Sequence, residues 1–301
     1  MTRAPDPATA GSLPDIEADA RRLAAVALAE DGERDVTTEL LARPDAAVAG
    51  ELQYRGGGVV AGLTYAQAVA ALAGCEPIEW TLGEGAIAAP GASLGWVRGG
   101  LQAVLRAERP MLNLLQRACG IATATRAFVT ALGDLPCAVL HTRKTAPGLR
   151  GLDLRAVVAG GGALHRSDLG TQVMFKDNHW WALARSGGEL GAVLEAGRRR
   201  GISDLYVEVE SLEQVETACA AGATRLLVDN QPPDTFRIWG EAARTLSSGI
   251  ELEATGGITL DNVRQYAEAG AGFVSVGALT HSVQAADLAI ELGDATGGSF
   301  K

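Results

Sequence analysis

The stretch LYVEVESLEQVETACAAGATRLLVDN, residues 205–230, decides how the second half of the chain folds. It begins with one apolar run, Leu205–Val209, and closes with another, Leu226–Asp229. Between them, Ser211 and Gln214 have the spacing of a capping box, which predicts that a helix starts there. A strand, a helix and a second strand joined by short turns form a βαβ unit, in which the two strands run parallel.

The same alternation of apolar runs and helical segments continues on both sides of this unit, throughout the chain after Pro136. Helices are predicted over 211–221 and 259–269. Six parallel strands with crossover helices predict a parallel sheet or an α/β barrel, and six strands instead of eight predict that the barrel is open. The predicted strands are Ala138–His141, Val173–Lys176, Leu205–Val209, Leu226–Asp229, Glu251–Ala254 and Phe273–Val276.

The chain before Pro136 has a different pattern, which predicts a small α+β layer domain. Strands are expected at 48–54, 58–61, 77–82 and 93–97, with a helix from Asp15 to Glu30 and another that Thr64 caps and that reaches Ala73. The polar segment 31–40 predicts a turn. Residues 101–132 have a helical pattern, in which Pro110 predicts the first turn of a new helix because proline is tolerated there.

Length and composition narrow the classes of function. The chain has 301 residues, a formal net charge of −10 and 47% hydrophobic residues, enough for a large core. The negative charge argues against nucleic acid or an anionic membrane surface as the main partner. The four cysteines lack metal spacing and are predicted to be reduced, buried thiols. Residues 1–15 lack the apolar core of a signal peptide and predict a flexible tail, so we expect a cytoplasmic protein without a membrane span.

Positive charge is nevertheless concentrated in one segment, residues 141–179. Three of the four histidines lie there, as do both internal lysines, Lys144 and Lys176. Together with Arg143, His165 and Arg166 they predict a pocket for a small anion, because guanidinium groups bind carboxylates and phosphates in a bidentate manner. The alternative is that these charges are solvated pairs in loops.

Carboxylates and glycines follow the predicted strands. Glu208 and Asp229 end adjacent strands, which suits binding of sugar hydroxyls or Mg²⁺. Glu210 should face the same way as Glu208, so composition does not choose between them, and either could be a surface charge. The turns after the last two strands contain Thr255, Gly256 and Gly277. Glycine-rich turns in this part of a barrel commonly hold phosphate.

Other polar residues carry weaker signals. Arg109, at a predicted helix start, taken alone suits a structural role, as does His281. No serine, cysteine or metal-ligand arrangement indicates a hydrolase triad or a zinc site.

Eight motifs, in order along the chain, resemble those of the quinolinate phosphoribosyltransferase family, also called nicotinate-nucleotide pyrophosphorylases. They are ERPMLNLLQRACGIAT at 108–123, HTRKTAPGLR at 141–150, GGGALHR at 160–166, MFKDNH at 174–179, VEVE at 207–210, LLVDN at 226–230, LEATGG at 252–257 and SVGALTHS at 275–282. DVTTEL at 35–40 and GVVAG at 58–62 extend the similarity towards the N-terminus.

The resemblance implies an N-terminal α/β sandwich domain over 1–123 and an incomplete α/β barrel over 124–283, with 284–301 rejoining the first domain. It also implies a homodimer in which Arg109 completes the partner's active site, reversing the structural reading of that residue. The carboxylates of quinolinate would lie among cations. These are Arg109, Arg143, Lys144, His165, Arg166 and Lys176. Catalytic roles would fall to Lys144, Lys176, Glu208 and Asp229.

The implied reaction makes nicotinate mononucleotide, pyrophosphate and CO₂ from quinolinate and phosphoribosyl pyrophosphate, as in NAD biosynthesis. The resemblance places Glu208 and Asp229 at the ribose and Mg²⁺, and Thr255, Gly256 and Gly277 near the 5′-phosphate, with no organic cofactor.

Three positions depart from the usual family pattern: His141, Leu164 and Thr255. The first two leave other readings open: a paralogue acting on a different carboxylated heteroaromatic ring, a molybdenum-transport-associated paralogue, or a non-catalytic anion binder. Lys176 favours the transferase.

Overall fold

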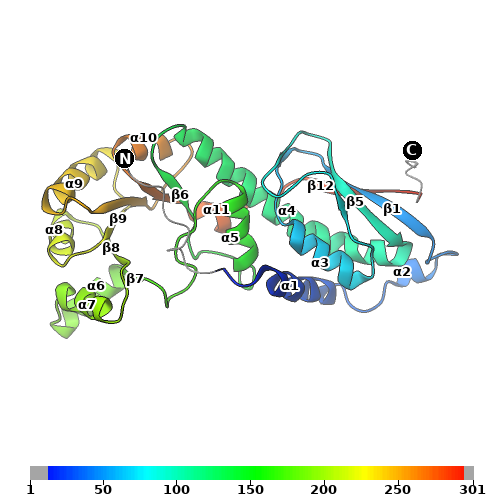
Figure 1. Ribbon diagram of the computed structural model, residues 1–301, viewed down its shortest axis with the longest axis horizontal. Helices are drawn as coiled ribbons and strands as arrows, with labels where there is room; N and C mark the ends of the chain where they lie inside the picture. The colour runs from blue at the N-terminus through cyan, green and yellow to red at the C-terminus, as the bar shows by residue number, and fades with distance from the viewer. Residues whose placement is uncertain (1–12, 295–301) are drawn as a thin grey trace. The chain divides into compact units, whose positions relative to one another are not determined.

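The computed structural model describes residues 13–294 (Figure 1). These residues form two compact units. The first, which we call the barrel unit, comprises residues 127–143 and 163–277. The second, which we call the layer unit, comprises residues 13–126, 144–162 and 278–294.

The barrel unit contains a parallel sheet with the strand order β6-β11-β10-β9-β8-β7. Its strands are β6 (Ala138–Leu140), β7 (Val173–Phe175), β8 (Leu205–Val209), β9 (Arg225–Asp229), β10 (Glu251–Thr255) and β11 (Phe273–Ser275). No pairing joins β6 to β7 within the described sheet, although Ala163 adds a parallel bridge to Leu140 on the free edge of β6. The predicted open α/β barrel is therefore confirmed.

Helices follow the strands of the barrel unit, and Figure 1 shows α8, α9 and α10 along the outside of the sheet. They are α6 (Asp177–Ser186), α7 (Leu190–Arg199), α8 (Leu212–Ala220), α9 (Pro233–Leu246) and α10 (Val263–Glu268). The cap predicted at Ser211 is present, because its side chain accepts a hydrogen bond from the N–H of Gln214 at 3.2 Å. The second half of the predicted box differs: the Gln214 side chain accepts from the N–H of Glu210 instead.

The layer unit is built on an antiparallel sheet with the order β12-β1-β5-β3 and a second sheet of β2 and β4. The strands are β1 (Ala47–Tyr54), β2 (Gly58–Val59), β3 (Glu79–Trp80), β4 (Ile87–Ala88), β5 (Ala92–Gly100) and β12 (Leu288–Asp294). The helices are α1 (Ile16–Glu30), α2 (Val36–Glu39), α3 (Leu63–Ala73), α5 (Arg150–Ala159) and α11 (Ala278–His281). Because β12 pairs with β1 over seven residues, the C-terminal strand belongs to this sheet.

One long helix, α4 (Leu101–Leu132), corrects the prediction of a new helix at Pro110. Proline lies inside it and removes one N–H from the helix ladder, a local cost of about 3 kcal/mol. Ala107, Met111 and Leu115 are fully buried on either side of the proline. Their burial continues the helix through the break because each such side chain stabilises by about 1.5–3 kcal/mol.

Three other local predictions were wrong. The segment 31–40 contains α2, capped by Asp35, whose Oδ1 accepts from the N–H groups of Thr37 and Thr38. Helix α3 begins after Gly62, and a distant carboxylate, Glu84, accepts from the N–H groups at its start in place of Thr64. Helix α10 begins at Val263 and not at Thr259, because the Asn262 side chain holds the preceding turn by accepting from the Thr259 N–H.

Among the described helices, none combines the length and the apolar character needed to cross a membrane. All four cysteines are free thiols. Cys119 and Cys219 are buried, whereas Cys75 and Cys137 are partly accessible. The tail predicted at residues 1–15 lies almost wholly outside the described residues.

Candidate functional site

Two neighbouring arginines form a cationic pair in the barrel unit, beside the carboxylates of Asp168 and Glu208. Arg143 follows β6, and its Nε is buried without a hydrogen-bond partner. The pKa of Arg166 is lowered, first by burial and then by the positive charge of nearby Arg143. An arginine remains protonated even so, because its ordinary pKa lies far above neutrality. The two guanidinium groups destabilise each other, and Arg143 also has a buried donor without a partner. A bound anion would stabilise both groups.

A lysine and a carboxylate meet across β7 and β8. Lys176, directly after β7, forms an ion pair with Glu208 of β8. The start of α6 is fixed at the same place, since the Trp180 indole donates to the Glu208 carbonyl at 2.8 Å and His179 Nδ1 accepts from the Lys176 N–H at 3.0 Å. Glu210 is exposed, so Glu208 and not Glu210 faces this lysine.

The next two strands place polar groups at the same edge. Asp229 ends β9 and lies opposite Thr255 in the register with β10. Asn230 has φ 52° and joins the two strand ends: its amide donates to Asp229 at 2.6 Å and its backbone N–H donates to the Thr255 carbonyl at 2.9 Å. A Cβ on Gly256, which has φ +77°, would lie 2.3 Å from Asn230 Oδ1. Any other residue at 256 would adopt a strained backbone and would displace the Asn230 and Asp229 side chains, so glycine favours this arrangement.

The remaining predicted residues divide between the two units. Gly277 follows β11 in the barrel unit, while Lys144 and Arg109 belong to the layer unit. Both of these are exposed. The Lys144 carbonyl accepts a hydrogen bond from Thr280 at 2.8 Å. Arg109 forms no ion pair within the described part of the chain.

The carboxylates could hold a magnesium ion. Among residues 13–294 there is no group of three or more His, Cys, Asp or Glu side chains arranged to bind a metal. Mg²⁺ needs fewer, because it usually keeps several waters and combines one or two carboxylates with substrate phosphates. Glu208 and Asp229, on adjacent strands, fit that donor set.

Comparison with known proteins identifies the family. The family model for the C-terminal domain of quinolinate phosphoribosyl transferase matches residues 121–291, and the model for its N-terminal domain matches residues 35–119. The chain belongs to the quinolinate phosphoribosyltransferase family.

Curated members of the family are similar over most of the chain. A nicotinate-nucleotide pyrophosphorylase (carboxylating) from Mycobacterium leprae is 36% identical over 265 residues, 86% of this chain and 91% of the relative. The human protein of the same name is 37% identical over 78% of this chain and 79% of its own length. A probable one from Bacillus subtilis is 41% identical over 67% of this chain and 68% of its own length.

Solved structures of family members share the fold. The nicotinate-nucleotide pyrophosphorylase from Francisella tularensis superposes with a TM-score of 0.85 at 29% identity, covering 94% of this chain and 98% of that chain. A NadC structure from Streptococcus pyogenes gives a TM-score of 0.84 at 32% identity, covering 94% and 99%.

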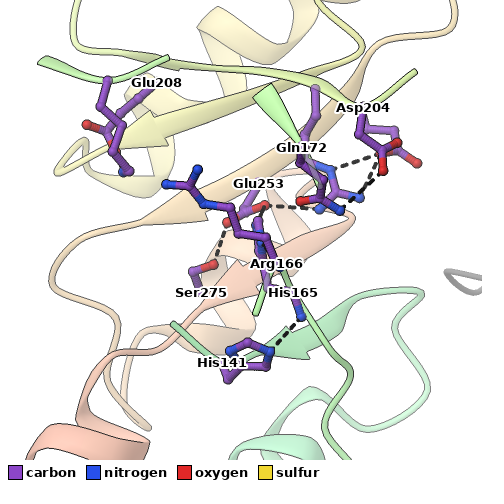
Figure 2. Close-up of polar contacts among 11 residues, drawn as sticks. His141, His165, Arg166, Gln172, Asp204, Glu208, Glu253 and Ser275 are labelled. Atoms are coloured by element: carbon purple, nitrogen blue, oxygen red, sulfur yellow. Dashed lines mark hydrogen bonds and ion pairs between the residues drawn. The ribbon is translucent and has the colours of Figure 1, made fainter. Parts of the chain in front are cut away.

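In this member of the quinolinate phosphoribosyltransferase family, the ring nitrogens of His141 and His165 form hydrogen bonds within the protein. His165 Nδ1 accepts from the Arg166 N–H at 2.7 Å, and Nε2 lies 3.2 Å from a carboxylate oxygen of Glu253. His141, which is fully buried, accepts at Nε2 from the backbone N–H of His165 at 2.9 Å. Figure 2 shows these contacts. Leu164, the other departure in this stretch, is only partly exposed.

Sequence reasoning missed the group to which His165 is bonded. Glu253 is completely buried and contacts Arg225 at 3.1 Å and the Ser275 hydroxyl. Burial raises the pKa of Glu253, but His165, Arg225 and Ser275 together lower it to about 2, so the group is a carboxylate. The available signal was two charged residues that precede or interrupt buried apolar positions, Arg225 at the start of β9 and Glu253 in the middle of β10.

Proposed function

We propose that this protein is a phosphoribosyltransferase that converts quinolinate and phosphoribosyl pyrophosphate into nicotinate mononucleotide, pyrophosphate and CO₂. The observation that carries the proposal is the pair Arg143 and Arg166, one of them with a buried unpaired donor, with the carboxylates of Glu208 and Asp229 on neighbouring strand ends. Such a site can bind a small dianion beside a sugar. The names of the curated relatives support the same reaction.

In this proposal the cations bind and orient quinolinate. Arg143 and Arg166 engage its carboxylates, because planar guanidinium groups match two oxygens at once. Lys144 and Lys176 add point charges, and Arg109 of the partner subunit completes the site in a homodimer. Holding the ring in one orientation presents its nitrogen to the sugar, which lowers the entropic part of the barrier.

The carboxylates act on the sugar. The ring nitrogen forms a bond to C1 of the ribose as the bond from C1 to pyrophosphate breaks, and positive charge develops on the sugar. Glu208 and Asp229 stabilise that charge electrostatically. The turn at Thr255 and Gly256, together with Gly277, offers backbone N–H groups to the 5′-phosphate. Glu208 and Asp229 would hold Mg²⁺, which would supply positive charge to offset that of the pyrophosphate.

Decarboxylation follows from the same bond. The ribosylated ring is a pyridinium, so it accepts the electron pair left when the adjacent carboxylate departs as CO₂, and a proton then takes its place on the ring carbon. No organic cofactor is required for this step.

The test is direct. Purified protein mixed with quinolinate, phosphoribosyl pyrophosphate and Mg²⁺ should release pyrophosphate, CO₂ and nicotinate mononucleotide in equal amounts. Omitting quinolinate provides the blank. If neither nucleotide nor pyrophosphate forms, the proposal is wrong.

A second candidate is a transferase that acts on a different carboxylated heteroaromatic ring, which the unusual Leu164 beside His165 motivates. A panel of pyridine and other heteroaromatic acids in the same assay separates the two. Quinolinate should have the highest kcat/KM of the panel, and a higher value for another acid would select the alternative.

A further inference from the structure

We infer that His165 positions Arg166 for the anion instead of binding the substrate itself. Three buried side chains, Glu253, Ser275 and His141, hold His165 in place. The inference rests on the proposed function only in taking the anion to be quinolinate. It concerns residues inside the barrel unit that are joined one to the next by hydrogen bonds (Figure 2).

The hydrogen bonds fix the protonation pattern of the His165 ring. A backbone N–H can only donate, so the bond from Arg166 requires a lone pair on His165 Nδ1. The proton of the neutral ring is then on Nε2, where it donates to Glu253. Both nitrogens are engaged inside the protein, and the residue is 6% exposed. Hence His165 has no free donor for a substrate carboxylate.

Glu253 is itself anchored by residues of two other strands and by His165. Ser275 of β11 donates to Oε1, while His165 and Arg225 of β9 share Oε2. The Arg225 side chain is held in place by two aromatic rings, because its Cζ lies 4.4 Å from the ring centroid of Tyr206 and 3.7 Å from that of Phe273. It also donates to the side chain of Glu251 on β10 at 2.9 Å.

His141 fixes the backbone on the other side of His165. The N–H of His165 donates to Nε2 of His141, so the proton of that ring is on Nδ1, which donates to the Thr142 carbonyl at 3.2 Å. His141 stands two residues before Arg143, and His165 directly precedes Arg166. This hydrogen bond, together with the bridge between Leu140 and Ala163, therefore ties together the two segments that carry the cationic pair.

That tie has a physical purpose. Arg143 lowers the pKa of Arg166, whereas the nearby carboxylates of Asp168 and Glu208 raise it. An unrestrained pair of arginines would lose its preorganised geometry for an anion. His141, His165 and Glu253 hold the two segments together without adding positive charge. The unusual histidine at 141 is, on this account, part of the scaffold and leaves the choice of substrate unchanged.

Selective ¹⁵N labelling of histidine tests the first half of the inference without any substrate. The chain has only four histidines, so comparison with His165→Gln and His141→Asn spectra assigns both signals. At pH 8, His165 should carry its proton on Nε2 and His141 on Nδ1. The reverse pattern at His165 would overturn the inference, whether or not the protein turns out to be a phosphoribosyltransferase.

Calorimetric binding of quinolinate tests the second half. Ser275→Ala removes one donor to Glu253 and should weaken quinolinate binding about three- to tenfold, the equivalent of one lost hydrogen bond. His165→Gln keeps a donor towards Glu253 and should bind more tightly than His165→Ala. Ser211→Ala, which removes a cap of α8, is the matched control and should leave affinity unchanged.

The outcomes separate the two proposals. Loss of affinity in Ser275→Ala with retained affinity in Ser211→Ala supports the positioning role. Equal affinities of Ser275→Ala and the wild type, with both folded by circular dichroism, would show that the network does not position the cations. If the wild type binds no quinolinate, the proposed function fails, and inorganic phosphate replaces quinolinate as the anion in the same comparison.

Discussion

The ion pair between Lys176 and Glu208 joins side chains of unequal exposure, 35% and 8%. Removing the lysine would leave the largely buried Glu208 carboxylate without a compensating charge. The lysine, in contrast, can turn towards an anion while its backbone is held by His179. At the scale of single residues, the Glu208 charge is therefore fixed inside the protein, whereas the Lys176 charge is accessible to an anion.

Replacing Lys176 with glutamine should lower kcat/KM about 100-fold, because it removes a charge from the anion site but leaves a donor for Glu208. The melting temperature should change little. Steady-state kinetics and calorimetry measure both. Arg185→Gln, which removes a positive charge at the exposed end of the same helix, should keep kcat/KM within about twofold. Equal losses in both variants would show a nonspecific effect of charge.

Gly256→Ala should raise KM for phosphoribosyl pyrophosphate, because its Cβ would displace Asn230 and Asp229. The added strain should also cost about 1–3 kcal/mol in free energy of unfolding. Gly257→Ala isolates the backbone effect, because Gly257 has φ +63° and a Cβ added there would meet no atom within 4 Å. A Cβ added at Gly249 would also meet no atom within 4 Å. Gly249→Ala should be neutral, whereas a wild-type KM in Gly256→Ala would remove this turn from the phosphate site.

Glu253 predicts an acid-sensitive contribution to stability. Its folded pKa of about 2 lies below the ordinary 4.5, so the unfolded chain takes up the proton first as the pH falls. The free energy of unfolding should therefore decline between about pH 4.5 and pH 2, and Glu253→Gln should show a flatter decline. Urea titrations at several pH values measure this. Parallel curves would contradict a depressed pKa.

At the scale of elements, local signals and packing compete. The Ser211 cap was legible because it uses neighbouring residues, whereas the cap of α3 comes from Glu84, more than twenty residues away. The predicted break at Pro110 followed local rules, but α4 continues because its buried face outweighs one missing hydrogen bond. The two-residue strand β4 was too short to leave a pattern.

The cap of α8 gives a clean test at this scale. Ser211→Ala should reduce the free energy of unfolding by about 1 kcal/mol, since it leaves an N–H at the helix start unsatisfied. Ser211→Asp should restore most of the loss because a carboxylate also accepts this bond. Urea denaturation measures both. If the aspartate variant is as unstable as the alanine variant, the side-chain bond is not what stabilises α8.

For the whole molecule, the open barrel could be predicted because six apolar runs alternate with helices in one continuous region. The candidate site could be predicted only in part: the scarcity of lysine singles out Lys176, which contacts Glu208, while the role of Lys144 stays a prediction. It was not predictable for Glu253 and Arg225, because only the folded sheet brings β9, β10 and β11 together around one carboxylate.

The proposed homodimer makes a prediction at the same scale. Mixing inactive Arg109→Ala and Lys176→Ala protomers should restore about a quarter of wild-type specific activity. Random exchange makes half of the dimers mixed, and one site in each mixed dimer has both residues intact. Native mass spectrometry confirms the exchange. Absence of recovery in demonstrably mixed dimers would contradict a shared site.

In the described sheet, β6 and β7 are the two edge strands and do not pair with each other. We call the gap between them the seam of the barrel. Arg143 follows one strand of that seam and Lys176 follows the other. Since no backbone ladder spans the two strands, their separation can change without breaking a strand pair. A dianion bound by both Arg143 and Lys176 would link the ends of β6 and β7. Ligand binding would then join two strands that no backbone hydrogen bonds connect.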